Sequence, residues 1–121
     1  MKRVLVVDDE PDIVEIVACL LEGEGYETLV ARDGIEAVEV AEAERPDLVL
    51  LDVMMPEMNG YQVCRLLRAK PEFRDTPVVM LTAKAQQSDQ FWGLDSGATA
   101  YLTKPFDNRE LLRTVGELIA S

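Results

Sequence analysis

Two kinds of apolar pattern alternate along this chain. Short unbroken apolar runs predict strands buried on both faces, as in a parallel sheet, and Leu48 to Leu51 is the clearest of them. Between these runs, apolar residues return every three or four positions, which predicts amphipathic helices. The predicted strands are residues 4–7, 26–31, 48–52, 76–82 and 100–103. The predicted helices run from Pro11 to the glycines at 23 and 25, from Gly34 past Ala41, from Tyr61 to the vicinity of Pro71, from Ser88 to Gly97, and from Asp107 or Asn108 to Ile119.

The alternation of five strands with five helices predicts an α/β sandwich built on a parallel sheet. Strand-helix-strand crossovers are right-handed in nearly all proteins, so we expect every strand to point the same way. A length of 121 residues fits one domain with a continuous core, and we expect residues 1–121 to form it.

Polar residues stand where the predicted strands end. Asp8 and Asp9 follow the first strand, Asp52 ends the third, Thr82 ends the fourth, and Lys104 follows the fifth. Parallel strands bring their carboxyl ends to one edge of the sheet, where ligands of open α/β folds bind. An aspartate is a poor strand residue and is costly to bury without a partner. The end of the third strand therefore predicts a functional carboxylate.

The composition narrows the chemistry further. The chain has no histidine, which excludes Ser-His-Asp hydrolysis, His-ligated zinc and a phosphohistidine on this chain. A net charge of −11 argues against direct binding to nucleic acid or to an anionic membrane surface. No apolar run reaches the roughly 18 residues of a membrane span, and the start lacks a signal peptide, so we expect a cytoplasmic protein. Cys19 and Cys64 have no metal-ligand spacing, and we expect both thiols to be buried.

Carboxylates gathered at one edge of a sheet require a cation. At contact distance each pair repels by about 4 kcal/mol for an effective dielectric constant near 20. Oxygen ligands without imidazole or thiolate select a hard ion, and we expect Mg²⁺, with Mn²⁺ as a substitute. An aspartate is already ionised at neutral pH and can attack phosphorus, with a lysine and a hydroxyl in contact with the phosphoryl oxygens. We therefore expect Asp52 to accept a phosphoryl group, in contact with Lys104 and Thr82.

Four segments together give the chain its resemblance to a known family. They are Asp8-Asp9, the run from Asp52 through Met54 and Pro56 to Gly60, Thr82-Ala83, and the run from Tyr101 through Lys104-Pro105 to Phe106. In this combination and order, the chain resembles over its whole length the receiver domain of bacterial two-component response regulators, of the chemotaxis and twitching-motility kind. The resemblance implies a flavodoxin-like doubly wound sandwich, with five parallel strands in the order 2-1-3-4-5 and five helices.

The resemblance also implies a role for individual residues at the metal and phosphoryl site. Asp52 corresponds to the phosphoacceptor, which forms a 4-aspartylphosphate. Asp9 and Asp52 correspond to direct Mg²⁺ ligands, the backbone carbonyl of Met54 to a third, and Asp8 to a ligand that acts through water.

Three further positions are implied to respond to the phosphoryl group. Thr82 and Lys104 correspond to residues that contact it, and Tyr101 to a switch residue that moves inward as Thr82 shifts. The Lys104-Pro105 bond corresponds to one that is cis in this family.

Finally, the resemblance implies a signalling cycle rather than an enzyme acting on metabolites. The phosphoryl source is a phosphohistidine on a sensor histidine kinase or a histidine phosphotransfer protein, and the domain slowly hydrolyses its own acyl phosphate. The readout lies on the fourth helix, fifth strand and fifth helix, for a downstream protein or a covalently linked output domain. We expect a monomer or a phosphorylation-dependent dimer. The alternative is a receiver-like interaction module that does not depend on phosphorylation.

Overall fold

The computed structural model describes residues 1–55, 57–83 and 97–120, in which helices and strands alternate. The predicted helix from Ser88 onward lies in residues 84–96, outside the described residues. A short 3-10 turn, η1, was not predicted, because Pro71 was interpreted only as the end of a helix. The elements are β1 (Arg3–Val7), α1 (Pro11–Gly23), β2 (Glu27–Ala31), α2 (Gly34–Glu44), β3 (Leu48–Asp52), α3 (Gly60–Arg68), η1 (Pro71–Phe73), β4 (Val78–Ala83), β5 (Ala100–Lys104) and α5 (Asn108–Ala120).

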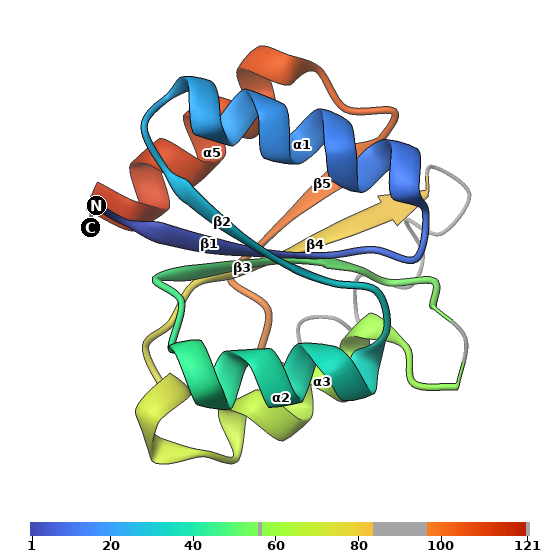
Figure 1. Cartoon of the computed structure of the whole chain (residues 1–121). Coiled ribbons are helices and arrows are strands. Elements are labelled where there is room, and N and C mark those ends of the chain that lie inside the picture. The colour runs from blue at the N-terminus through green and yellow to red at the C-terminus, as the bar shows by residue number, and fades with distance from the viewer. Residues whose placement is uncertain (56, 84–96, 121) are drawn as a thin grey trace.

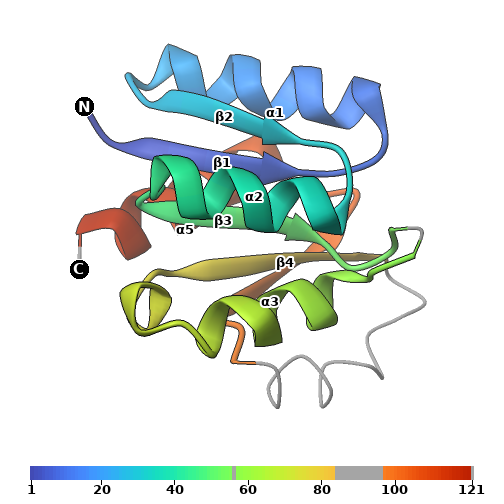
Figure 2. The same ribbon diagram turned by 60° about the horizontal axis from the view of Figure 1, so that its bottom comes forward.

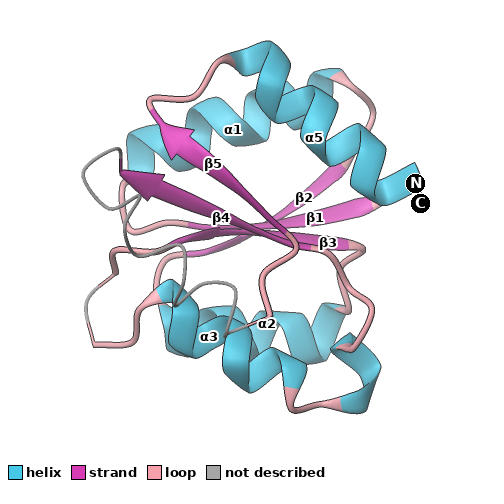
Figure 3. Ribbon diagram, turned by 180° about the vertical axis from the view of Figure 1, so that it is seen from behind, coloured by secondary structure: helices cyan, strands magenta, loops and turns pink. Residues whose placement is uncertain are grey.

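The five strands form one parallel sheet in the order β2-β1-β3-β4-β5, as the resemblance implied. Helices α1 and α5 cover one face of the sheet, and α2 and α3 cover the other (Figure 1, and from behind in Figure 3). All four strand pairs are parallel, and Figure 2 shows β1, β2 and β3 pointing the same way. Their carboxyl ends therefore share one edge, as predicted.

The central strands of the sheet are buried on both faces, which explains their unbroken apolar runs. All five residues of β3 are buried. Its alternate residues point to opposite faces, so that Leu51 packs with α2 and α3 and Leu50 packs with α1 and α5. Any residue on this strand is held by packing on both sides, and this includes Asp52 at its end.

Local signals fix where the helices begin and end. The Asp33 side chain accepts from the Glu36 N–H at the start of α2, and Asn59 forms a capping box at the start of α3. Of the two predicted caps for α5, Asp107 takes the position, since its carbonyl accepts from the Leu111 N–H and its carboxylate from the Arg109 N–H. Gly25, with φ +90°, turns the chain after α1.

One of the two thiol predictions is wrong. Cys64 is buried, but Cys19 is exposed on the outer side of α1. Val17 and Leu21 are the buried residues of this helix, and a residue midway between them is turned roughly 200° away from the core. None of the helices in the described part of the chain combines the length and apolar character needed to cross a lipid bilayer.

Candidate functional site

The polar residues predicted to meet at the sheet edge do meet there. Asp8 and Thr82 are fully buried, and Asp52 is 4% exposed. The Lys104 ammonium contacts both carboxylates, since its Nζ lies 2.8 Å from Asp8 Oδ2 and 3.4 Å from Asp52 Oδ1. Residues as far as 96 positions apart in the sequence thus form one charged cluster at the ends of β1, β3 and β5.

Backbone hydrogen bonds hold the two buried carboxylates in place. Asp8 Oδ1 accepts from the Glu10 N–H at 3.0 Å, and Asp52 Oδ1 accepts from the Met54 N–H at 3.3 Å. In each case the loop after the strand folds back onto the carboxylate that ends it. The carboxylates are therefore positioned before any ligand arrives.

Gly60 brings the next helix directly against Asp52. Its N–H donates to the Val53 carbonyl at 3.0 Å, and a Cβ on this residue would lie 2.5 Å from the Asp52 carbonyl oxygen. No side chain fits in that distance, so a glycine is required where the loop returns. The capping box at Asn59 then starts α3 at this point.

Burial and neighbouring charge shift the ionisation of this cluster. Burial, together with the adjacent Asp8 charge, raises the pKa of Asp52 to about 7, although Lys104 and the Met54 N–H partly oppose the rise. For Lys104, burial by itself lowers the pKa, but the hydrogen bond to Asp8 and the charges of Asp52 and Asp8 raise it above its ordinary value. Asp52 is therefore only partly ionised at neutral pH, not fully ionised as the sequence predicted, and a second positive charge beside it would favour its ionised form.

The donor set fits a hard divalent cation. Carboxylate oxygens of Asp8, Asp9, Glu10 and Asp52 lie within 4.8 Å of one another, and all are oxygen ligands. Asp9 and Glu10 are exposed, so the cluster is open to solvent on one side. Met54 is 60% exposed, and the role expected of its backbone carbonyl stays a prediction. Glu10 was not among the predicted site residues. The sequence feature that could have identified it is its position directly after the Asp8-Asp9 pair.

The Thr82 hydroxyl is a second indication that this edge of the sheet binds a ligand. Its Oγ1 is buried and has no hydrogen-bond partner within the described residues. Burying a hydroxyl without a partner costs about 1–3 kcal/mol, so such groups are uncommon unless something else completes them. A bound anion beside Asp52 and Lys104 would supply the acceptor.

Tyr101 lies on β5, the strand that ends at Lys104, and pairs with Met80 of β4. It is half-buried against the core on the α2 and α3 side. Burial and the nearby Tyr61 and Cys64 raise its pKa to about 12, so its hydroxyl stays protonated. The Lys104-Pro105 bond is cis, as the resemblance implied.

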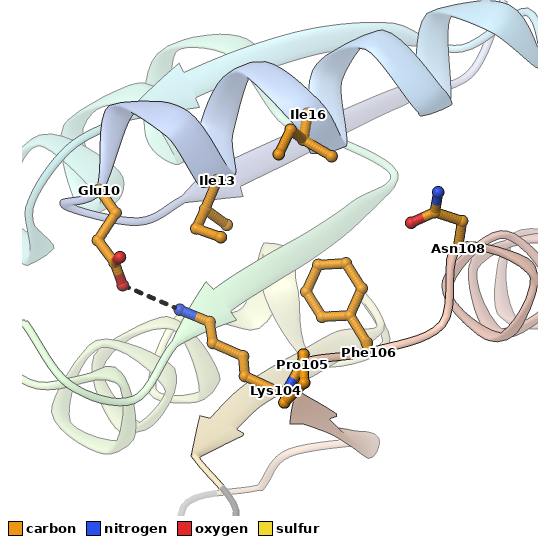
Figure 4. A pocket seen from close by; sticks show the side chains of 7 residues that line it. All are labelled: Glu10, Ile13, Ile16, Lys104, Pro105, Phe106 and Asn108. Carbon is orange, nitrogen blue, oxygen red and sulfur yellow. Dashed lines mark ion pairs between the residues drawn. The ribbon is translucent and has the colours of Figure 1, made fainter.

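A cavity of about 360 Å³ opens beside the charged cluster, between α1 and the start of α5 (Figure 4). Ile13 and Ile16 of α1 line one side, and Pro105 and Phe106 line the other. Glu10 and Lys104 stand at one end of this cavity and face each other, with the Glu10 Oε1 3.6 Å from the Lys104 Nζ.

Comparison with known proteins identifies the family. The DNA-binding response regulator MtrA of Mycolicibacterium smegmatis is 49% identical over 114 residues, which are 94% of this chain and 49% of that protein, so the chain spans about half the length of this relative. The chemotaxis response regulator CheY4 of Vibrio cholerae has a TM-score of 0.92 at 36% identity and covers 98% of both chains.

A third comparison concerns a receiver domain described with magnesium. It belongs to a sensor histidine kinase of Pseudomonas aeruginosa, has a magnesium ion coordinated in its active site cleft, and superposes with a TM-score of 0.91 at 37% identity, covering 99% of this chain and 98% of the other. The sequence profile of the response regulator receiver domain matches residues 4–116. This chain, with its flavodoxin-like fold and acidic strand ends, therefore belongs to the family of response regulator receiver domains.

Proposed function

We propose that this receiver domain accepts a phosphoryl group on Asp52 from a phosphohistidine of a sensor histidine kinase or histidine phosphotransfer protein. One observation carries the proposal: the Asp52 carboxylate is held at a strand end 3.4 Å from the Lys104 ammonium, and the neighbouring strand β4 carries the buried Thr82 hydroxyl, which has no partner among the described residues. A nucleophile, a cation and a hydrogen-bond donor are what a phosphoryl acceptor site needs.

The acidic cluster supports a magnesium site in this domain. Asp9 and Asp52 would bind the ion directly together with the Met54 carbonyl, and Asp8 would act through water; Mn²⁺ is the substitute with the closest ligand preference. Mg²⁺, when bound, supplies positive charge that offsets the repulsion between these carboxylates and an incoming phosphoryl donor. The magnesium described in the Pseudomonas aeruginosa receiver domain supports the same assignment here.

In the proposed transfer, an ionised Asp52 oxygen attacks phosphorus and forms a new O–P bond. The P–N bond of the phosphohistidine breaks, and its electron pair returns to the imidazole nitrogen. Lys104, now 3.4 Å from Asp52 Oδ1, moves its ammonium onto a phosphoryl oxygen, and the Thr82 hydroxyl donates to another. Slow attack of water on the same phosphorus would return the domain to its resting state.

The proposed output is a change of surface rather than a chemical product. The added charge would draw Thr82 toward the phosphoryl group and let Tyr101 move inward, which changes the face formed by β5, α5 and the predicted fourth helix. A downstream protein, or an output domain in a longer chain such as the DNA-binding relative, would bind this face. The net charge of −11 argues against direct binding of this domain to nucleic acid or to an anionic membrane surface. We place it in the cytoplasm, as a monomer or a phosphorylation-dependent dimer.

Intact mass spectrometry after incubation with acetyl phosphate tests the proposal. We expect the parent chain to gain the mass of one phosphoryl group with Mg²⁺ and not with chelator, and Asp52→Asn to gain none. Glu39→Gln, an exposed change on α2, is the control and should match the parent. If the parent chain gains no phosphoryl group from acetyl phosphate or from a phosphohistidine donor, it is instead a phosphorylation-independent interaction module.

A further inference from the structure

Glu10 stands at the start of α1, yet its side chain does not serve the helix. It holds the N-cap position with φ −94° and ψ 110°, but makes no capping hydrogen bond. The usual capping residues at this position are Asn, Asp, Ser and Thr, and the longer glutamate side chain can reach a partner outside the helix. The Glu10 carboxylate instead turns to the Lys104 ammonium, with the two groups 3.6 Å apart (Figure 4).

Lys104 consequently has three carboxylate neighbours of very different exposure. The Asp8 and Asp52 side chains are 0% and 6% exposed, whereas that of Glu10 is 62% exposed. The two buried carboxylates hold the ammonium inside the cluster. Glu10 attracts it from the solvent side, at the end of the cavity beside α1.

We propose that Glu10 is a positioning residue for Lys104 that slows phosphoryl uptake. This inference rests on the proposed function of Asp52. For transfer, the Lys104 ammonium must give up some of its contacts with the three carboxylates and move onto a phosphoryl oxygen. The negative charge of Glu10 attracts the ammonium and so opposes that move. The same charge faces an incoming anionic donor, because its carboxylate lies within 4.8 Å of those of Asp8, Asp9 and Asp52.

The expected size of the effect follows from the exposure of Glu10. Exposed ion pairs change an equilibrium by roughly two- to fivefold, so Glu10→Gln should raise the rate of uptake from acetyl phosphate by that factor at low ionic strength. At about 1 M salt the screening length is about 3 Å, so the advantage of the variant should fall toward one. A purely structural role for Glu10 would not give this salt dependence.

The experiment measures the rate of adduct formation at saturating Mg²⁺, in low and high salt, for the parent and three variants. Glu10→Gln removes the charge, Glu10→Asp keeps the charge on a shorter side chain, and Asp12→Asn removes an exposed charge from the same helical turn outside the cluster. We expect a salt-sensitive acceleration for Glu10→Gln, a smaller one for Glu10→Asp, and none for Asp12→Asn.

The outcomes separate this inference from the proposed function. No adduct on the parent chain would remove the function of Asp52 and the role of Glu10 with it. An adduct on the parent with an unchanged or slower rate for Glu10→Gln, or an equal gain for Asp12→Asn, would overturn the role of Glu10 alone. Circular dichroism during thermal unfolding checks that each variant is folded, and a folded variant gives a decisive rate.

Discussion

Replacing Asp52 by asparagine should stabilise the fold near neutral pH. In the folded chain, burial and the adjacent Asp8 charge raise the pKa of Asp52 from 3.8 to about 7. Between these values the folded state holds a proton that the unfolded state has released. The free energy of unfolding of the parent chain therefore falls as the pH rises from 3.8 to about 7. Above about pH 7 both states are ionised, and the loss stays constant.

The pKa difference sets the magnitude. From 3.8 to about 7, at about 1.4 kcal/mol for each pH unit, the cost reaches about 4 kcal/mol near pH 8. Near pH 5 less than half of that window has been crossed, and the cost is below about 2 kcal/mol. An asparagine side chain in this place has nearly the same shape and carries no charge to bury, so the variant avoids this cost.

Urea unfolding without Mg²⁺, at about pH 5 and pH 8, measures the difference. We expect Asp52→Asn to raise the free energy of unfolding by up to about 4 kcal/mol near pH 8 and by less than about 2 kcal/mol near pH 5, with the same m-value as the parent. Glu39→Gln should change neither value, because Glu39 is exposed. A destabilised Asp52→Asn near pH 8, or an equal gain at both pH values, would refute the reasoning.

Three further predictions concern the same edge of the sheet. Gly60→Ala places a Cβ 2.5 Å from the Asp52 carbonyl oxygen and should lower both stability and the rate of adduct formation. Gly23→Ala, whose Cβ would meet no atom within 4 Å, is the control and should leave the rate unchanged. Mass spectrometry measures the rate of adduct formation for both variants. Mg²⁺ at about 100 times its dissociation constant should raise the free energy of unfolding by about 2.7 kcal/mol, and Asp9→Asn should lose most of this gain in a thermal shift titration. Thr82→Val removes a hydroxyl that has no partner in the described part of the chain, so stability should hold or rise by about 1 kcal/mol while adduct formation slows roughly tenfold. A slow variant that is also unstable would indicate a packing defect instead.

The strands were predictable because a strand that is buried on both faces leaves an unbroken apolar run in the sequence. A strand such as β3, buried on both faces, must be apolar throughout, so Asp52 at its end stands out without any structural knowledge. Parallel pairing then brings distant strand ends to one edge of the sheet, as predicted, and the structure adds that Lys104 reaches Asp8 across that edge. The family resemblance supplied the strand order and the cis bond before Pro105.

The features that were not predicted depend on the direction of individual side chains. Glu10 directly follows the Asp8-Asp9 pair, but the sequence does not show which way its side chain turns, and only the structure places its carboxylate beside Lys104. Cys19 has apolar neighbours in sequence, but the helical turn places it outside. The lone Thr82 hydroxyl could not be recognised either, because the lack of a partner among the described residues is a property of the packed structure.

Chemical trapping of the phosphorylated residue tests the central claim most directly. Borohydride reduces an aspartyl phosphate to homoserine, which peptide mass spectrometry locates in the sequence. After incubation with Mg²⁺ and a phosphoryl donor, we predict homoserine at position 52 and at no other aspartate, and none when Mg²⁺ is removed. Homoserine at Asp8 or Asp9, or a phosphorylated chain without homoserine at position 52, would contradict the account.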